Sequence, residues 1–138
     1  MPSSHPDLHH ALDALQRGRT SAAGQLERSI EAAQSPACEH AFLKTAFDGA
    51  RRAAQDKAAA SRPLMGLAVS VKDLFDVQGE VSAAGSVVLA DSPPAAADCP
   101  AVARLRAAGA AFIGRTNMTE FAYSGVGINP HYGTPANP

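Results

Sequence analysis

Lys72 is the residue whose type and position best suit catalysis. It follows a short apolar run, Leu67 to Val71, which is typical of a buried strand, whereas the other lysines lie in polar stretches predicted to be helical. Burial lowers a lysine pKa from about 10.4 by up to roughly 3 to 5 units, and an uncharged lysine can accept a proton. The alternative is a solvated ammonium at a strand end. The two-residue period of a strand directs the neighbouring Asp73 to the opposite face, so Asp73 need not keep Lys72 charged.

The sequence from residue 63 onward predicts an α/β unit around this lysine. The strand that precedes Lys72 is expected to be buried on both faces. A helix with Pro100 in its first turn is expected to be capped by Asp98 and ended by Gly109, and a second buried strand follows over 110–114. A strand, a helix and a second strand in one sheet form a crossover, which makes the two strands parallel.

The C-terminal part of the sequence predicts one more short helix and then a loop. Asn117 and Glu120 have the spacing of a capping box that leads into Phe121 and Ala122. Beyond Ser124, repeated Gly, Pro and Asn residues leave no room for a regular element.

Residues 1–62 are predicted to form a helical N-terminal region. The expected helices run from about residue 8 to Gly18, from Thr20 or Ser21 to Pro36, and over about 41–60. The predicted fold class is therefore α/β, in which an N-terminal helical layer precedes the start of a mixed β-sheet core that is flanked by helices. The predicted division is a helical region over 1–62 and a partial α/β core over 63–138.

The composition excludes several classes of partner. Twelve Lys and Arg face thirteen Asp and Glu, the formal net charge is −1, and no basic cluster is present, so no direct binding to nucleic acid or to an anionic membrane is expected. The sequence has neither an apolar run long enough to span a membrane nor the start of a signal peptide, which predicts a cytoplasmic protein. Cys38 and Cys99 suit reduced thiols, and we expect no metal and no organic cofactor.

The residues around Lys72 resemble the amidase signature family. The stretch Pro63 to Asp73 reads PLMGLAVSVKD, and the family form is Pro-Leu-x-Gly-Ile-Pro-Val-x-Val-Lys-Asp. Ala68 stands where the family usually has Pro. The similarity continues through Ala84-Gly85-Ser86, Val102 to Ala110, Gly114 to Ala122 and Gly127 to Pro138. These blocks cover roughly residues 63–138 in the order and spacing of the family.

The resemblance implies acyl transfer on amides by a Ser-Ser-Lys triad. In the family, one serine attacks the amide carbonyl, a second serine relays its proton, and the lysine is the base; Lys72 matches that lysine. This is the logic of an activated nucleophile, with a neutral lysine in place of histidine. The family places both serines in a Gly/Ser-rich segment after the Asn-Pro block. We therefore expect the chain to stop before them at Pro138 and to have no amidase activity alone.

The resemblance also implies roles for residues outside the triad. Ala122, Tyr123 and Ser124 match positions that line the acyl pocket, and Gly85 and Ser86 match positions near the lysine, where Ser86 could hydrogen-bond to it. The pattern alone allows the residues from Phe121 onward to be helix core instead. As substitute nucleophiles, Ser82, Ser86 and Ser124 lack the strand-Ser-helix elbow of serine hydrolases and are better explained as structural.

Three functions remain after these observations. The first is the N-terminal part of an amidase that hydrolyses carboxylic amides to an acid and ammonia or an amine. The second is the amidase subunit of a tRNA-dependent amidotransferase, in which a different subunit carries the nucleic acid. The third is a short binding protein without catalysis. The expected partner is a small-molecule amide, and the sequence leaves open a homo-oligomer or a partner subunit.

Overall fold

The computed structural model describes residues 7–136, so Asn137 and Pro138 of the last matching block lie outside the described residues. In chain order, the helices and strands are α1 (Leu8–Gln16), α2 (Ala22–Ala33), β1 (Phe42–Thr45), α3 (Phe47–Gln55), β2 (Ala68–Lys72), α4 (Pro100–Ala107) and β3 (Ala111–Thr116). Three short 3-10 helices cover Pro36–Cys38, Ala59–Ser61 and Glu120–Ala122. The expected fold class, a helical layer with a mixed sheet, is confirmed.

The sheet has the strand order β1-β3-β2, with β3 in the centre. β2 and β3 are parallel, as expected of a crossover through α4, whereas β1 is antiparallel to β3. β1 comes from within residues 1–62 and joins the same sheet as the two later strands. The division at residue 62 stays a prediction.

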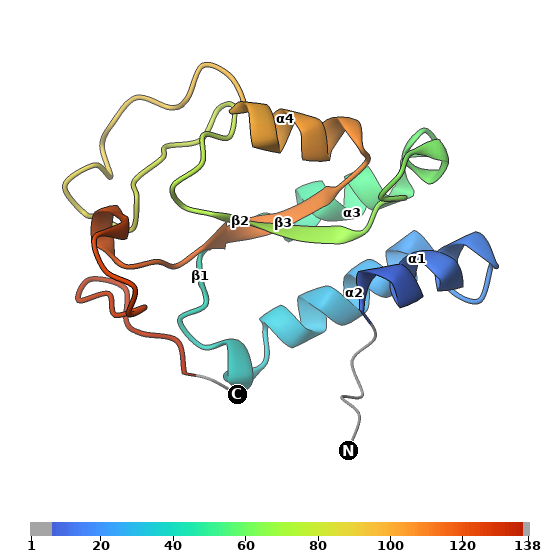
Figure 1. Cartoon of the computed structure of the whole chain (residues 1–138), viewed down its shortest axis with the longest axis horizontal. Coiled ribbons are helices and arrows are strands. Elements are labelled where there is room, and N and C mark those ends of the chain that lie inside the picture. Colours follow the sequence, from blue (N-terminus) through green and yellow to red (C-terminus); the bar gives the residue numbers. More distant parts are fainter. Residues whose placement is uncertain (1–6, 137–138) are drawn as a thin grey trace.

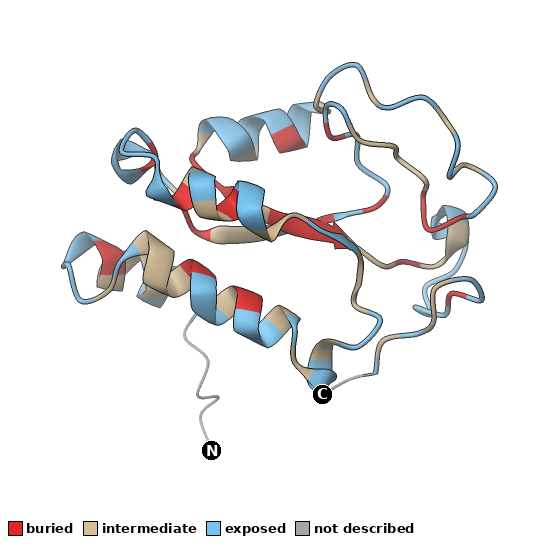
Figure 2. Cartoon of the chain, turned by 180° about the vertical axis from the view of Figure 1, so that it is seen from behind, coloured by how far each residue is buried: buried red, intermediate tan, exposed pale blue. Residues whose placement is uncertain are grey.

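Helices cover both faces of the sheet (Figure 1). On one face, Leu26 and Ile30 of α2 pack with Ala50 and Ala54 of α3 against β3. On the other face, Val102 of α4 packs against β2 and the loop that follows it. The small alanines of α3 let the helix lie close to the sheet, and Figure 2 shows buried residues concentrated between these layers.

The first two helices lie within the ranges that the sequence predicts, although α2 ends at Ala33 and Pro36 begins a separate 3-10 helix. Asp7 accepts a hydrogen bond from the backbone N–H of His10, and Ser21 accepts one from Gly24. Gly18 has a φ of 65°, the left-handed conformation that ends a helix at least steric cost. Ser21 rather than Thr20 is therefore the cap of α2.

The single helix expected over 41–60 is wrong. Residues Phe42–Thr45 form β1, α3 covers only Phe47–Gln55, and Ala59–Ser61 is a 3-10 turn. Thr45 pairs with Gly114 and Phe42 with Thr116, so the backbone hydrogen bonds of this segment go to β3 instead of a preceding helical turn. Pairing with a distant strand has overridden the local helical spacing.

Two details of the predicted α/β unit also need correction. Cys99 is the N-cap of α4, because the Asp98 carboxylate instead accepts hydrogen bonds from the backbone of Gln78 and from Arg106. β2 is an edge strand, and of its residues only Val71 is buried. The expectation of a strand buried on both faces is correct for β3 and wrong for β2.

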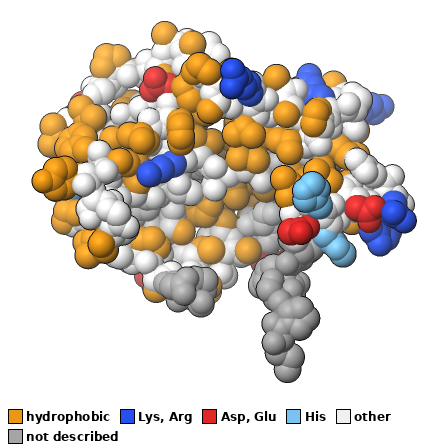
Figure 3. All heavy atoms as spheres, viewed as in Figure 1, with side chains coloured by type: hydrophobic (Ala, Val, Ile, Leu, Met, Phe, Trp, Pro, Cys, Tyr) orange, Lys and Arg blue, Asp and Glu red, His pale blue; other side chains and the backbone are white. Residues whose placement is uncertain are grey.

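Exposed apolar side chains gather over the loops that follow β2 and β3. Figure 3 shows hydrophobic side chains across much of this face, with Lys and Arg scattered among them. The large ones include Phe75, Val88, Tyr123, Val126 and Ile128. No helix within residues 7–136 combines the length and the apolar character needed to span a membrane.

Candidate active site

Lys72 is the last residue of β2 and is exposed. Its side chain makes no hydrogen bond or ion pair with another side chain in the part of the chain that the structure describes, residues 7–136. An apolar groove of about 120 Å³ lies at this strand edge, lined by Lys72, Phe75 and residues of β2 and α4. Lys72 thus ends a parallel strand, as the sequence predicts, but the described residues leave it exposed instead of burying it.

Asp73, the next residue, is buried and pairs with Arg115 of β3. Arg115 Nε lies 3.1 Å from Asp73 Oδ1, and the two side chains are 4% and 6% exposed. Both terminal nitrogens of the guanidinium are buried without a hydrogen-bond partner among the described residues. As expected from the strand period, Asp73 and Lys72 have different surroundings, one buried and one exposed. The sequence did not indicate the partner of Asp73.

Asp73 also holds the turn that contains Gly85 and Ser86. Its Oδ2 accepts the backbone N–H of Gly85 at 2.9 Å, and its carbonyl oxygen accepts that of Ala84 at 3.1 Å. Gly85 has a φ of 67°, and a Cβ there would lie 2.8 Å from the Met118 carbonyl oxygen, so only glycine fits. This turn is therefore bonded to Asp73, the residue that follows the lysine strand.

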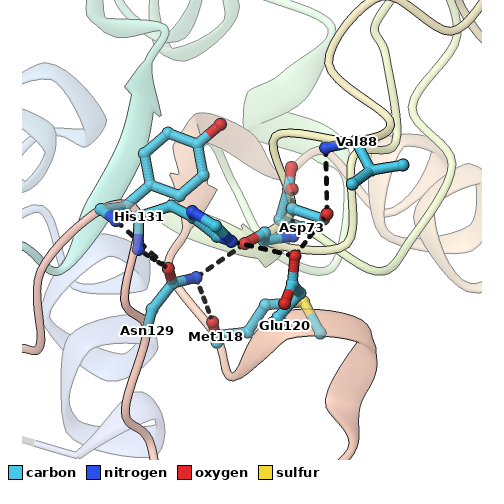
Figure 4. Close-up of polar contacts among 9 residues, drawn as sticks. Asp73, Val88, Met118, Glu120, Asn129 and His131 are labelled. Carbon is cyan, nitrogen blue, oxygen red and sulfur yellow. Dashed lines mark hydrogen bonds and ion pairs between the residues drawn. The ribbon is translucent and has the colours of Figure 1, made fainter.

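Ser86 is fully buried and bonds to Glu120. Its hydroxyl donates to Glu120 Oε1 at 2.6 Å and accepts the backbone N–H of Val88 at 3.1 Å (Figure 4). The hydrogen bond between Ser86 and Lys72 that the sequence suggested is not made, because Glu120 takes the hydroxyl proton. His131 Nε2 lies 3.1 Å from the same carboxylate oxygen. The Ser86 hydrogen bond, and then the contact with His131, hold the pKa of Glu120 below its ordinary value.

The capping box expected at Asn117 and Glu120 is not formed. The 3-10 helix begins only after Thr119, and the Asn117 amide donates to the carbonyl oxygens of His40 and Gly133. Glu120 points instead toward Ser86. The Asn117 amide oxygen, the atom that would cap a helix, accepts the backbone N–H of Met118 at 2.8 Å instead, and the Glu120 carboxylate binds Ser86 and His131.

Asn129 connects the C-terminal loop to the rest of the site. It is 2% exposed, and its amide nitrogen donates to the carbonyl oxygens of Gly85 and Met118 at 2.7 and 2.8 Å. Its amide oxygen accepts the backbone N–H groups of His131 and Tyr132. The sequence indicated only a turn at Asn129-Pro130, and no local pattern marked this amide as buried.

Ala122, Tyr123 and Ser124 lie on an exposed turn rather than in helix core. Tyr123 is 92% exposed, and Phe121 and Ala122 have φ values of 54° and 55°. The backbone N–H of Phe121 donates to the Ala84 carbonyl oxygen at 2.9 Å, which places this turn beside the Gly85 turn. The side chains of the three expected pocket residues are thus open, and whether they contact an acyl group stays a prediction.

The hydroxyl of each serine weighed as a substitute nucleophile makes a hydrogen bond to a group other than Lys72. Ser82 donates to Asp76 at 2.6 Å, Ser124 accepts the backbone N–H of Val126, and Ser86 donates to Glu120.

A second hollow, of about 550 Å³, lies among residues 76–100 and is not lined by Lys72. Across residues 7–136, no group of three or more His, Cys, Asp or Glu side chains is placed to hold a metal ion.

Comparison with known proteins identifies the family. The amidase family model matches residues 25–138. AtzE, the 1-carboxybiuret hydrolase subunit of Pseudomonas sp. (strain ADP), is 50% identical over 76 residues, which are 55% of this chain and 17% of that protein. A glutamyl-tRNA(Gln) amidotransferase subunit of Azoarcus sp. (strain BH72) is 38% identical over 144 residues, covering 99% of this chain and 28% of that protein.

Comparison with solved structures supports the same family. A crystal structure of an amidase superposes with a TM-score of 0.80 at 35% identity, covering 94% of this chain and 31% of that one. The structure of 6-aminohexanoate cyclic dimer hydrolase gives a TM-score of 0.81 at 26% identity, covering 94% and 27%. The chain spans less than a third of the length of these relatives. In sequence and in fold, it belongs to the amidase signature family.

Proposed function

We propose that this chain supplies the lysine-bearing part of an amidase that hydrolyses carboxylic amides to an acid and ammonia or an amine. Lys72 is the base, and Ala122, Tyr123 and Ser124 contact the acyl group of the amide. The nucleophilic and relay serines come from the Gly/Ser-rich segment that the family resemblance places after the Asn-Pro block. No metal or organic cofactor takes part, and the protein is cytoplasmic.

The observation that carries this proposal is the place of Lys72. It ends a strand parallel to the central strand, its amine is free of carboxylate partners within residues 7–136, and the adjacent Asp73 is turned to Arg115. A lysine that accepts a proton must be reachable by a hydroxyl and must not be paired with a carboxylate, since the pairing favours its charged form. Polypeptide packed over the exposed edge of β2 supplies the burial that residues 7–136 do not.

The first test is turnover of simple aliphatic and aromatic amides by the purified chain. We expect none, because each serine weighed as a substitute nucleophile is bonded elsewhere: Ser82 to Asp76, Ser86 to Glu120 and Ser124 to the backbone of Val126. Turnover that Lys72→Ala abolishes would contradict this expectation.

The second test uses a chimera in which this chain replaces the matching part of a related, active amidase. Lys72→Ala and Lys72→Arg are expected to lower kcat by roughly 10³-fold or more, because removing a triad member leaves only binding and oxyanion stabilisation. Lys57→Ala, at an exposed position, is the matched control and is expected to leave kcat unchanged. Equal losses in the Lys72 and Lys57 variants would argue against a catalytic lysine.

A second candidate is the amidase subunit of a tRNA-dependent amidotransferase. The similarity to the glutamyl-tRNA(Gln) amidotransferase subunit extends over 99% of the chain, compared with 55% for AtzE. Such a subunit would act on glutamine and bind a second subunit. Glutamine hydrolysis by the chimera that depends on an added second subunit would favour this candidate, whereas hydrolysis of simple amides by the chimera alone would favour the first.

A further inference from the structure

Glu120 joins two segments that are far apart in the sequence. One oxygen of its carboxylate accepts the Ser86 hydroxyl at 2.6 Å and lies 3.1 Å from His131 Nε2 (Figure 4). Ser86 is fully buried, whereas Glu120 and His131 are 29% and 31% exposed. A hydrogen bond to an ionised carboxylate is shorter and stronger than one between neutral groups. Glu120 therefore links the Ser86 turn to the C-terminal loop through these two contacts.

The Ser86 turn is itself tied to the end of the lysine strand. Gly85 donates its backbone N–H to Asp73, the residue after Lys72, at 2.9 Å. Asn129 binds the carbonyl oxygen of Gly85 and accepts the backbone N–H of His131, so the other partner of Glu120 is tied to the same turn. Hydrogen bonds thus run without a break from the end of β2 to Glu120.

The turn that follows Glu120 is held in a conformation that it would not adopt alone. Phe121 and Ala122 both have φ near 55°, a region that costs a residue with a Cβ atom about 1–3 kcal/mol and persists only where the surroundings impose it. Packing does not impose it, since the side chains from Phe121 to Ser124 are exposed. The restraints on this turn are therefore hydrogen bonds. The Phe121 N–H bonds to Ala84, short-range backbone bonds return to Thr119 and Glu120, and the Thr119 hydroxyl bonds to Val126. Of these groups, the Glu120 side chain is the one that ties the turn to both Ser86 and His131.

We propose that Glu120 is a positioning residue of the amidase site: its bridge between Ser86 and His131 sets the turn of Ala122, Tyr123 and Ser124 in place relative to Lys72. In this role Glu120 acts on the amide through the turn, and its carboxylate binds Ser86 and His131 and not Lys72. The assignment of the turn to substrate rests on the proposed function, whereas the bridge itself belongs to this chain and can be tested without catalysis.

Amide hydrogen exchange in the 138-residue chain tests the bridge. Glu120→Ala is expected to speed exchange at the backbone N–H groups of Val88 and Phe121 by about tenfold or more, since both are held by hydrogen bonds of this network. Glu120→Gln is expected to restore most of the protection, because its amide oxygen can accept from both partners. Glu31→Ala, an exposed acid on α2, is the control and is expected to change neither rate.

Ser86→Ala removes one side of the bridge with little change in volume and carries the test if Glu120→Ala does not fold. Exchange at Phe121 within twofold of wild type in the folded Glu120→Ala or Ser86→Ala chain would overturn the proposal.

Kinetics of the chimera separate positioning from a merely structural role. Glu120→Ala is expected to raise KM for the amide about fivefold or more, with a smaller change in kcat, and Glu120→Gln is expected to recover most of KM. A loss of kcat at unchanged KM would overturn the positioning role. If Lys72→Ala abolishes turnover while Glu120→Ala alters neither KM nor exchange, the positioning proposal alone fails. If Lys72→Ala leaves turnover intact, the proposed function fails, and the exchange result still decides on the bridge.

Discussion

Removing the Asp73 carboxylate should destabilise this protein more than removing any exposed charged side chain. Asp73→Ala leaves the Arg115 guanidinium, whose side chain is 4% exposed, without its counter-ion. Breaking a buried pair from one side costs about 3–5 kcal/mol, because the remaining charge is neither solvated nor paired. The same change removes the acceptor of the Gly85 N–H, which is worth about 1 kcal/mol more.

The free energy of unfolding in urea measures this loss. A single domain has about 5–15 kcal/mol of stability in total, so a loss of about 5 kcal/mol is a large fraction of it. With a urea dependence of about 2 kcal/mol per molar, the midpoint should fall by about 2.5 M. Glu27→Ala is the matched control. It breaks the exposed bidentate pair with Arg51, at 2.8 and 2.9 Å, and should lower the urea midpoint far less, because solvent screens an exposed ion pair.

A double variant distinguishes a stranded charge from simple loss of packing. Asp73→Ala combined with Arg115→Met removes both charges and the unpartnered guanidinium nitrogens, and it should recover about 2 kcal/mol or more relative to Asp73→Ala. Two results would refute the reasoning. One is an Asp73→Ala cost no larger than that of Glu27→Ala, and the other is a double variant no more stable than the single one.

Three further predictions concern the sheet, the core and the acid range. Gly114→Ala would bring a Cβ to 2.3 Å from a backbone carbonyl oxygen of β1, and its free energy of unfolding should fall by about 3 kcal/mol in urea. Gly18→Ala, where the space is open, should lose much less stability. Leu26→Ala, at a fully buried position, should cost about 2–5 kcal/mol in the same assay and raise dye binding. Arg106 holds the pKa of Asp98 below its ordinary 3.8. The pair therefore stabilises the fold above that pH, and this stabilisation is lost as the pH falls. Asp98→Asn should make the urea midpoint fall less steeply between about pH 5 and 3.

The elements nearest Lys72 could be predicted because their patterns are local. An apolar run of strand length before Lys72, a helix beginning at Pro100 and ending before Gly109, and a second apolar run are each visible within a few residues. The parallel arrangement of the two strands then follows from the crossover. Local signals that agree with the global fold are the ones that a single sequence reveals.

β1 could not be found in this way. It has four residues, of which Lys44 and Thr45 are exposed, so neither burial nor alternation marks it as a strand. Its backbone hydrogen bonds exist only because β3 lies beside it, about 70 residues later in the chain. The same limit applies to β2, since whether a strand is central or at the edge depends on the strands that flank it.

The polar residues around the site were missed for a related physical reason. Glu120 and Asn117 have capping-box spacing, yet each finds a partner in a distant loop that satisfies its side chain better than a local cap. Arg115 lies just beyond the strand predicted over 110–114, and nothing near it in the sequence indicates that Asp73 is its partner. Side-chain pairing across a fold carries no periodic signal.

The two carboxylates beside the lysine strand should therefore respond differently to removal. Asp73 is buried against β3, and its loss strands a charge in the interior, so the effect should reach the free energy of global unfolding. Glu120 is partly exposed, and its partners lie in loops, so its loss should open those loops while the sheet and its helices stay folded. An Asp73→Ala chain that loosens only the loops, or a Glu120→Ala chain that unfolds as a whole, would mean that the sheet and the site are coupled more tightly than these contacts allow.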